Sequence, residues 1–201
     1  KTTTKKPRRH LKNLSRFMYG LYSKTFSRTW QSSALEDSRY IKKLQGARLV
    51  RVNKEAANFL YKEAKKSKME KKERIMVLRG YYDEKNKIIH ITGATPYEEL
   101  EEECKTMGRG KFYVDGSVWW EIVTFRENKG LKEEGPIMLC HTHLSDRPLR
   151  EGIGTDIQVA GITKMPEMVA KATDRLDVLV YSSDRKLLSQ KNTIIPHEIE
   201  D

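Results

Sequence analysis

The sequence predicts an α/β layered domain that follows a basic N-terminal extension. From residue 47 onward, strand-like and helix-like patterns alternate along the chain, which favours a sheet covered by helices. Apolar residues make up 37% of the 201 residues, enough for one hydrophobic core. Residues 1–50 hold 13 basic and two acidic side chains, which account for the whole net charge of +11. We therefore predict an extension over residues 1–46 and a domain over residues 47–201.

Composition excludes several classes of protein. No run of about 18 apolar residues exists, so we expect no transmembrane segment. The polar, basic start of the chain lacks the apolar stretch of a secretory signal. Cys104 and Cys140 lie far apart, which excludes a disulfide framework and a four-cysteine zinc site. These observations predict an intracellular protein, cytoplasmic or, in a eukaryote, nuclear.

The N-terminal extension has a helical pattern. From Pro7, apolar residues recur at steps of three and four, which predicts an amphipathic helix followed by a linker over residues 31–46. Two interpretations of the basic side chains outside this stripe stay open. They are simply solvated, or they also bind nucleic acid, an anionic membrane surface or a partner protein. These side chains are Lys5, Lys6, Arg8, Arg9, Lys12, Arg16, Lys24 and Arg28.

The first elements of the domain follow from local patterns. Residues 47–52 predict a strand, and Asn53 is a suitable N-cap for a helix over residues 54–66. Strands over residues 74–82 and 87–92 flank an Asp-Glu-Lys-Asn segment, which indicates a hairpin.

The later elements leave more room for alternatives. The Thr-Pro-Tyr-Glu segment at 95–98 has the form of a capping box and predicts a helix start. Residues 117–127 fit a strand and a helix equally well. The other elements expected are a buried strand over 136–140, a helix over 156–172 that Pro166 kinks or ends, a strand over 177–181 and an edge strand over 193–195.

Two of the five histidines form a His-Thr-His motif directly after a short apolar run. At the end of a strand, residues i and i+2 point the same way, so His141 and His143 should face one point. Two imidazoles so placed can supply two zinc ligands, and a third ligand with a water molecule would complete a catalytic site. The patterns of zinc deaminases and of HExxH metalloproteases are missing from the sequence.

The surrounding residues resemble the JAMM (MPN/JAB1) metalloprotease family. That family carries a Glu on an early strand, six residues and a Gly, then His-Ser/Thr-His, a loop, and an Asp that opens a helix. Here Glu73 and Gly80 match the first part, the His-Thr-His motif the second, and Asp156 the third. The resemblance spans roughly residues 47–185, and it implies a JAMM-like mixed sheet flanked by helices.

The resemblance also implies a zinc-dependent isopeptidase or peptidase. His141, His143 and Asp156 would bind the zinc ion together with one water molecule. Glu73 would act as the general base and then as the general acid. The implied substrate is an isopeptide bond to a ubiquitin-like protein or a related conjugate, such as a small C-terminal peptide or sulfur-carrier conjugate.

The loop after His143 departs from the family pattern. Asp156 lies 13 residues after His143 instead of 11, which a longer loop explains, and Ile153 stands where the family has a Ser. An inactive or weak site would leave a JAMM-like scaffold that binds nucleic acid or a ribonucleoprotein through residues 1–50. The candidates that this shift leaves are Ser145 and Thr155 for oxyanion support, and Asp146 and Glu151 as alternatives to Asp156.

Overall fold

The computed structural model describes part of the chain. The described residues are 38–97, 116–144, 149, 160, 164–182, 187, 191 and 193–196, with side chains from residue 122 onward in the second range. The amphipathic helix expected from Pro7 lies outside them, and so do all the basic side chains from Lys5 to Arg28. Ser145, Thr155 and Asp156 also lie outside the described residues.

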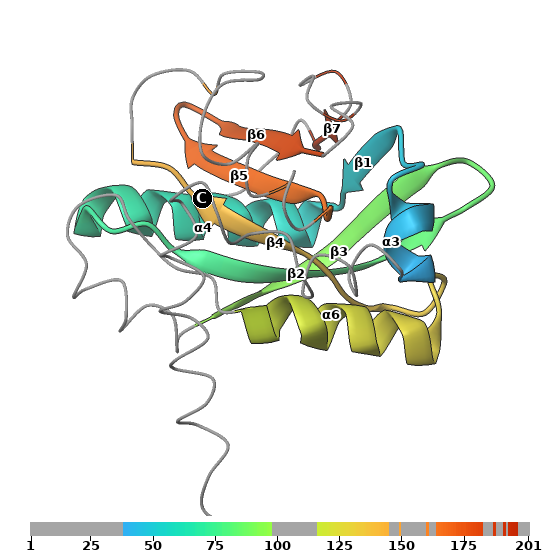
Figure 1. The fold of residues 1–201 in the computed structure, drawn as a ribbon. Helices are drawn as coiled ribbons and strands as arrows, with labels where there is room; N and C mark the ends of the chain where they lie inside the picture. Colours follow the sequence, from blue (N-terminus) through green and yellow to red (C-terminus); the bar gives the residue numbers. More distant parts are fainter. Residues whose placement is uncertain are drawn as a thin grey trace, which may run out of the picture.

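Within the described residues, seven strands form one mixed sheet, in the order β6-β5-β4-β2-β3-β1-β7 (Figure 1). Strand β2 is antiparallel to both of its neighbours, while β4 is parallel to β5 and β1 is parallel to β3 and to β7. The prediction of an α/β domain is confirmed at this level. The strands are β1 (Leu49–Val52), β2 (Ile75–Asp83), β3 (Ile88–Pro96), β4 (Gly135–Thr142), β5 (Glu167–Ala172), β6 (Leu176–Tyr181) and β7 (Thr193–Ile194).

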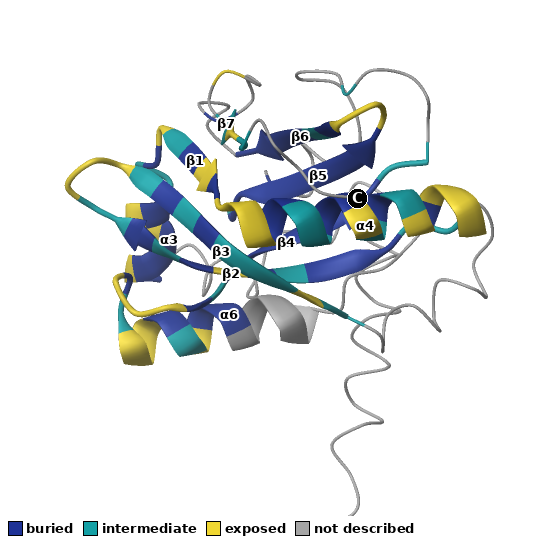
Figure 2. Cartoon of the chain, turned by 180° about the vertical axis from the view of Figure 1, so that it is seen from behind, coloured by how far each residue is buried: buried dark blue, intermediate teal, exposed yellow. Residues whose placement is uncertain are grey.

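Two longer helices lie on opposite sides of the sheet (Figure 1). Helix α4 (Lys54–Glu70) begins as predicted, because Asn53 Oδ1 accepts a hydrogen bond of 2.8 Å from Ala56 N. Its apolar side packs on the sheet and its other side is exposed (Figure 2). Helix α6 (Gly116–Lys129) settles the ambiguity over residues 117–127 in favour of a helix. No helix in the described ranges is long and apolar enough to cross a membrane.

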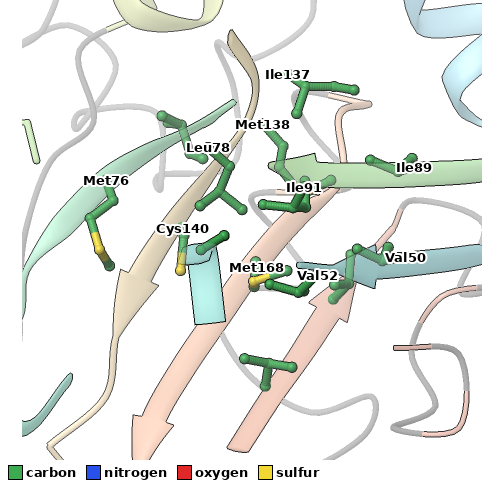
Figure 3. Close-up of a cluster of buried hydrophobic side chains, with 14 of the residues drawn as sticks. Val50, Val52, Met76, Leu78, Ile89, Ile91, Ile137, Met138, Cys140 and Met168 are labelled. Carbon is green, nitrogen blue, oxygen red and sulfur yellow. The ribbon is translucent and has the colours of Figure 1, made fainter. Parts of the chain in front are cut away.

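The core gathers apolar side chains from five strands. Val50, Leu78, Ile91, Met138 and Met168 come from β1, β2, β3, β4 and β5 respectively and meet in one cluster (Figure 3). Each of these side chains is at least 98% buried. This cluster fixes the central strands in place.

Three local predictions are wrong for residues that the structure describes. The linker expected over residues 31–46 includes helix α3 (Arg39–Leu44), whose Tyr40, Ile41 and Leu44 side chains are buried in the core. Thr95 and Pro96 continue strand β3 rather than begin a helix. The C-terminal part of the helix expected over 156–172 is strand β5, whose six residues are all buried. Full burial removes the alternation of apolar and polar residues that distinguishes a strand from a helix. Pro166, directly before β5, disfavours a helix that runs through this segment.

A buried arginine ties α6 to the sheet. The Arg126 side chain donates hydrogen bonds of 2.6 Å to the carbonyl oxygens of Gly80 and Gly135 and one of 2.8 Å to that of Pro136. It also donates to the carbonyl oxygens of Gly130 and Glu133. A buried guanidinium is tolerated because these acceptors replace water. The same contacts hold the start of β4, the strand that carries the histidines.

Candidate metal centre

Strand β4 carries the histidine pair at its C-terminal end, between β2 and β5. His141 is the second-last residue of the strand and is 1% exposed, and His143 follows the strand and is half-buried. The apolar run over residues 137–140 is buried, as its composition predicts. A rigid central strand therefore places His141, and the chain just after it places His143.

The two imidazoles face one another. His141 Nε2 lies 3.1 Å from His143 Nε2, and the ring planes are tilted by 48°. The prediction that both rings face one point is confirmed. Two nitrogen atoms bound to one tetrahedral zinc ion at about 2.0–2.1 Å would lie about 3.4 Å apart, close to the observed separation. Two nitrogen lone pairs at this distance repel unless a proton or a cation lies between them.

A carboxylate on the next strand orients His141. Glu167 Oε1 lies 2.9 Å from His141 Nδ1, the ring nitrogen on the far side from His143. The two side chains are 3% and 2% exposed respectively. Sequence reasoning missed Glu167 because it assigned this segment to a helix. The signal was a lone acidic residue in an otherwise apolar stretch, which is unusual in a buried strand.

Glu73 lies two residues before the start of β2, the strand that pairs with the histidine strand β4. Ile75 on β2 pairs with His141 on β4, and Thr142 N donates to Arg74 O at 2.9 Å. Glu73 itself precedes the paired residues and is half-buried. Its role as the catalytic base stays a prediction.

Glycine at position 80 is required by a close approach between strands. A Cβ atom on Gly80 would lie 1.8 Å from the carbonyl oxygen of His90, and the pairing of β2 with β3 shifts register at this point. The match of Gly80 to the family pattern therefore has a structural reason. The bulge bends β2 five residues beyond Ile75, the partner of His141.

A buried lysine lies on the other flank of His143. The His143 N–H donates to the Ala170 carbonyl oxygen at 3.0 Å, which continues the parallel pairing of β4 with β5. Lys171 is the next residue along β5, on the same face of the sheet as Glu167. Its side chain is only 3% exposed. The strand pairing thus sets Lys171 next to His143 along the sheet, while the Glu167 carboxylate contacts His141 directly.

Cys140 is a core residue rather than a ligand. It lies on the opposite face of β4 from the histidines and is fully buried. Burial raises the pKa of its thiol well above the usual range, and the Glu167 carboxylate raises it further. A protonated thiol binds zinc poorly, so the reading of Cys140 as a buried apolar side chain is supported.

The predicted third ligand, Asp156, lies outside the described residues. Within these, no group of three or more His, Cys, Asp or Glu side chains is placed to hold a metal ion. Ala160 and Leu149 pack against Val169, Leu179 and Tyr181. Val169 pairs with His141, so Ala160 and Leu149 lie against the face of the sheet that carries His141. The role of Asp156 as a ligand stays a prediction.

Comparisons with known proteins identify no family for this chain. No protein-family model matches the chain, and no curated protein does. Among solved structures, the chain is similar to the solution structure of protein DSY2949 from Desulfitobacterium hafniense, with 12% identity and a TM-score of 0.49. The match covers 76% of this chain and 96% of that chain. A likeness at this level carries no argument about function.

Proposed function

We propose that this chain is a zinc-dependent hydrolase of the JAMM type that cleaves an isopeptide or peptide bond to a ubiquitin-like protein or a related conjugate. The observation that carries the proposal is the histidine pair, whose Nε2 atoms face each other at 3.1 Å. The pairing of Ile75 with His141 supports it, because Glu73 is only two residues from Ile75 along the chain. The donor set also fits zinc, because a neutral imidazole held by a carboxylate is a common zinc ligand.

Six side chains have roles in the proposed mechanism. His141 and His143 would hold zinc, together with Asp156 as the predicted third ligand. When bound there, zinc lowers the pKa of a water molecule to about 7 and polarises a carbonyl group. Glu73 accepts the proton of the attacking water and then donates it to the leaving amine. Ser145 and Thr155 remain the candidates for supporting the oxyanion.

Glu73 offers a sharp test of this mechanism. Glu73→Gln keeps the shape of the side chain but removes the base, so cleavage of an isopeptide-linked ubiquitin-like substrate should fall by about 10²–10⁴-fold. Zinc binding should be unchanged, because Glu73 is not a ligand. Glu55→Gln is the matched control, since Glu55 is an exposed carboxylate in the first turn of α4. Equal cleavage by both variants would exclude Glu73 as the base.

A second candidate function is supported by the distribution of charge. The whole net charge of +11 lies in residues 1–50, which favours binding of nucleic acid or a ribonucleoprotein through the extension. Replacing Arg8, Arg9, Lys12 and Arg16 with Gln should weaken RNA binding and flatten its salt dependence. Binding of RNA by this variant with unchanged affinity and salt dependence would rule out the proposal.

A further inference from the structure

We propose that Glu167 is a positioning residue of the metal centre, which holds the His141 ring with its hydrogen on Nδ1 and so presents Nε2 to the zinc ion. This inference rests on the proposed function. It concerns a residue that the family pattern of Glu, His-Thr-His and Asp does not include. Glu167 lies on β5, and His141 on the neighbouring strand β4.

The contact with an ionised Glu167 assigns the hydrogen to one nitrogen of the His141 ring. An ionised carboxylate can only accept hydrogen bonds, so the contact of 2.9 Å between Glu167 Oε1 and His141 Nδ1 requires a hydrogen on Nδ1. A neutral imidazole carries one N–H, so its Nε2 atom then acts as an acceptor and can bind a metal ion. This is the atom that faces His143 Nε2. The carboxylate therefore selects the tautomer that a shared metal ion needs.

Stability alone does not explain the position of Glu167. The side chain is 3% exposed, and its Oε2 atom has no hydrogen-bond partner among the described residues. Within those residues, His141 is the one side-chain partner of the Glu167 carboxylate. A buried carboxylate with an unsatisfied oxygen is costly, and an apolar residue would pack in a fully buried strand without that cost. The placement is explained if the negative charge serves the cation that the histidines bind.

The proposed role has a measurable size. A carboxylate that accepts from a ligating histidine fixes the orientation of the ring and raises its basicity. Removal of such a partner typically weakens metal binding by about 10–100-fold. Because Glu167 contacts Nδ1 and a zinc ion would bind Nε2, the effect would pass through the His141 ring.

The test compares zinc affinity in three forms of the full chain, by competition with a chromophoric chelator. Glu167→Gln removes the charge at nearly constant shape and should weaken zinc binding by about 10–100-fold. Met168→Leu is the matched control, because Met168 is the next residue, is fully buried and faces the other side of the sheet. It should bind zinc within about twofold of the unsubstituted chain.

A second measurement does not depend on the variant folding. In the unsubstituted chain labelled with ¹⁵N-histidine, nuclear magnetic resonance should show a hydrogen on His141 Nδ1 that is protected from solvent exchange. Equal zinc affinity of the Glu167→Gln variant and the unsubstituted chain, or a His141 Nδ1 without hydrogen, would overturn this inference alone. Failure of the unsubstituted chain to bind zinc would overturn the proposed function and this inference together.

Discussion

The polar groups at the end of β4 have different hydrogen-bonding arrangements on the two faces of the sheet. On the face toward α4, Arg74 N donates to Thr142 Oγ1, whose hydroxyl reaches Ser67 Oγ at 2.7 Å, and Ser67 donates to Lys72 O. The Thr142 and Ser67 hydroxyls therefore each accept one hydrogen bond and donate one. On the other face, the two imidazoles share one hydrogen bond between their Nε2 atoms, and Glu167 Oε2 has no hydrogen-bond partner among the described residues.

The difference separates polar groups that serve the fold from polar groups that we propose to bind a metal ion. The hydrogen-bonded hydroxyls on the α4 face join the end of α4 to β2 and β4. On the face with the histidines, a metal ion would take the place of the proton between the two imidazole nitrogens. Substitutions on the first face should therefore change stability, and those on the second should change metal binding.

The largest expected effect is on zinc binding. His143→Ala removes a predicted zinc ligand. Loss of a residue that only orients a ligand weakens metal binding by up to about 100-fold, and the loss of the ligand itself should weaken it more. Stability without zinc should change little, since His143 is half-buried and follows the strand. His90→Ala is the control, because it removes a ring on β3 that stacks on Tyr81 of β2. Isothermal titration of the two variants with zinc should give opposite results, and retained affinity in His143→Ala would contradict the site.

Zinc should also stabilise the folded chain through the same face. At a free zinc concentration 100 times the dissociation constant, the free energy of unfolding should rise by about 2.7 kcal/mol. Removal of zinc with a chelator should reverse the increase. Urea unfolding with and without zinc measures this difference. The comparison of the two faces would fail if His143→Ala showed the same stabilisation.

On the α4 face, Thr142→Val should affect stability alone. The variant leaves Arg74 N without its acceptor and Ser67 Oγ without its donor, so the free energy of unfolding should fall by about 1–3 kcal/mol. Thr124→Val, at an exposed position on α6, should change it much less. Urea unfolding provides the values, and zinc titration should show unchanged affinity. A large loss of zinc affinity in Thr142→Val would show that the two faces are not independent.

The smallest expected effect concerns a third polar contact, between α3 and α6. Burial raises the pKa of Glu127. Hydrogen bonds from the Ser38 hydroxyl and the Tyr40 N–H lower this pKa by more, so the net shift is downward. A carboxyl with a lowered folded-state pKa stabilises the fold above its unfolded pKa of about 4.3. That contribution is lost as the pH falls through the folded value.

Ser38→Ala removes the hydroxyl that donates to Glu127. It also removes the N-cap of α3, because Ser38 Oγ accepts a hydrogen bond from Ile41 N. The free energy of unfolding should fall by about 0.5–2 kcal/mol at pH 7. The difference from the unsubstituted chain should narrow as the pH drops below about 4.3, because protonated Glu127 no longer needs the donor. Urea unfolding at pH 7 and at acidic pH would detect this, and a constant difference would assign the whole effect to the N-cap.

Local patterns predicted the site better than they predicted its surroundings. The apolar run before the His-Thr-His motif defines a buried strand, and alternation along that strand places His141 and His143 together. Glu167 could not be found in this way, because it belongs to the site through the pairing of β5 with β4, which is a contact between distant segments. A fully buried strand also has no alternation by which the sequence could distinguish it from a helix.

The same reason explains the arginine and the short helix. The residues around Arg126 give no sign of its burial, which depends on the carbonyl oxygens of Gly80 in β2 and Gly135 in β4. Helix α3 spans six residues, too few for a clear periodic pattern, and it owes its place to burial of Tyr40, Ile41 and Leu44. Tertiary contacts decide such elements, whereas the motif depends on local geometry alone.

Zinc analysis of the purified full chain tests the central claim most directly. After incubation with zinc and removal of the excess, we expect about one tightly bound zinc ion per chain, with two imidazole nitrogens in its X-ray absorption spectrum. The same treatment should leave His143→Ala without bound zinc. A chain that retains no zinc, or one whose zinc has no imidazole ligands, would contradict the assignment of His141 and His143 as a metal centre.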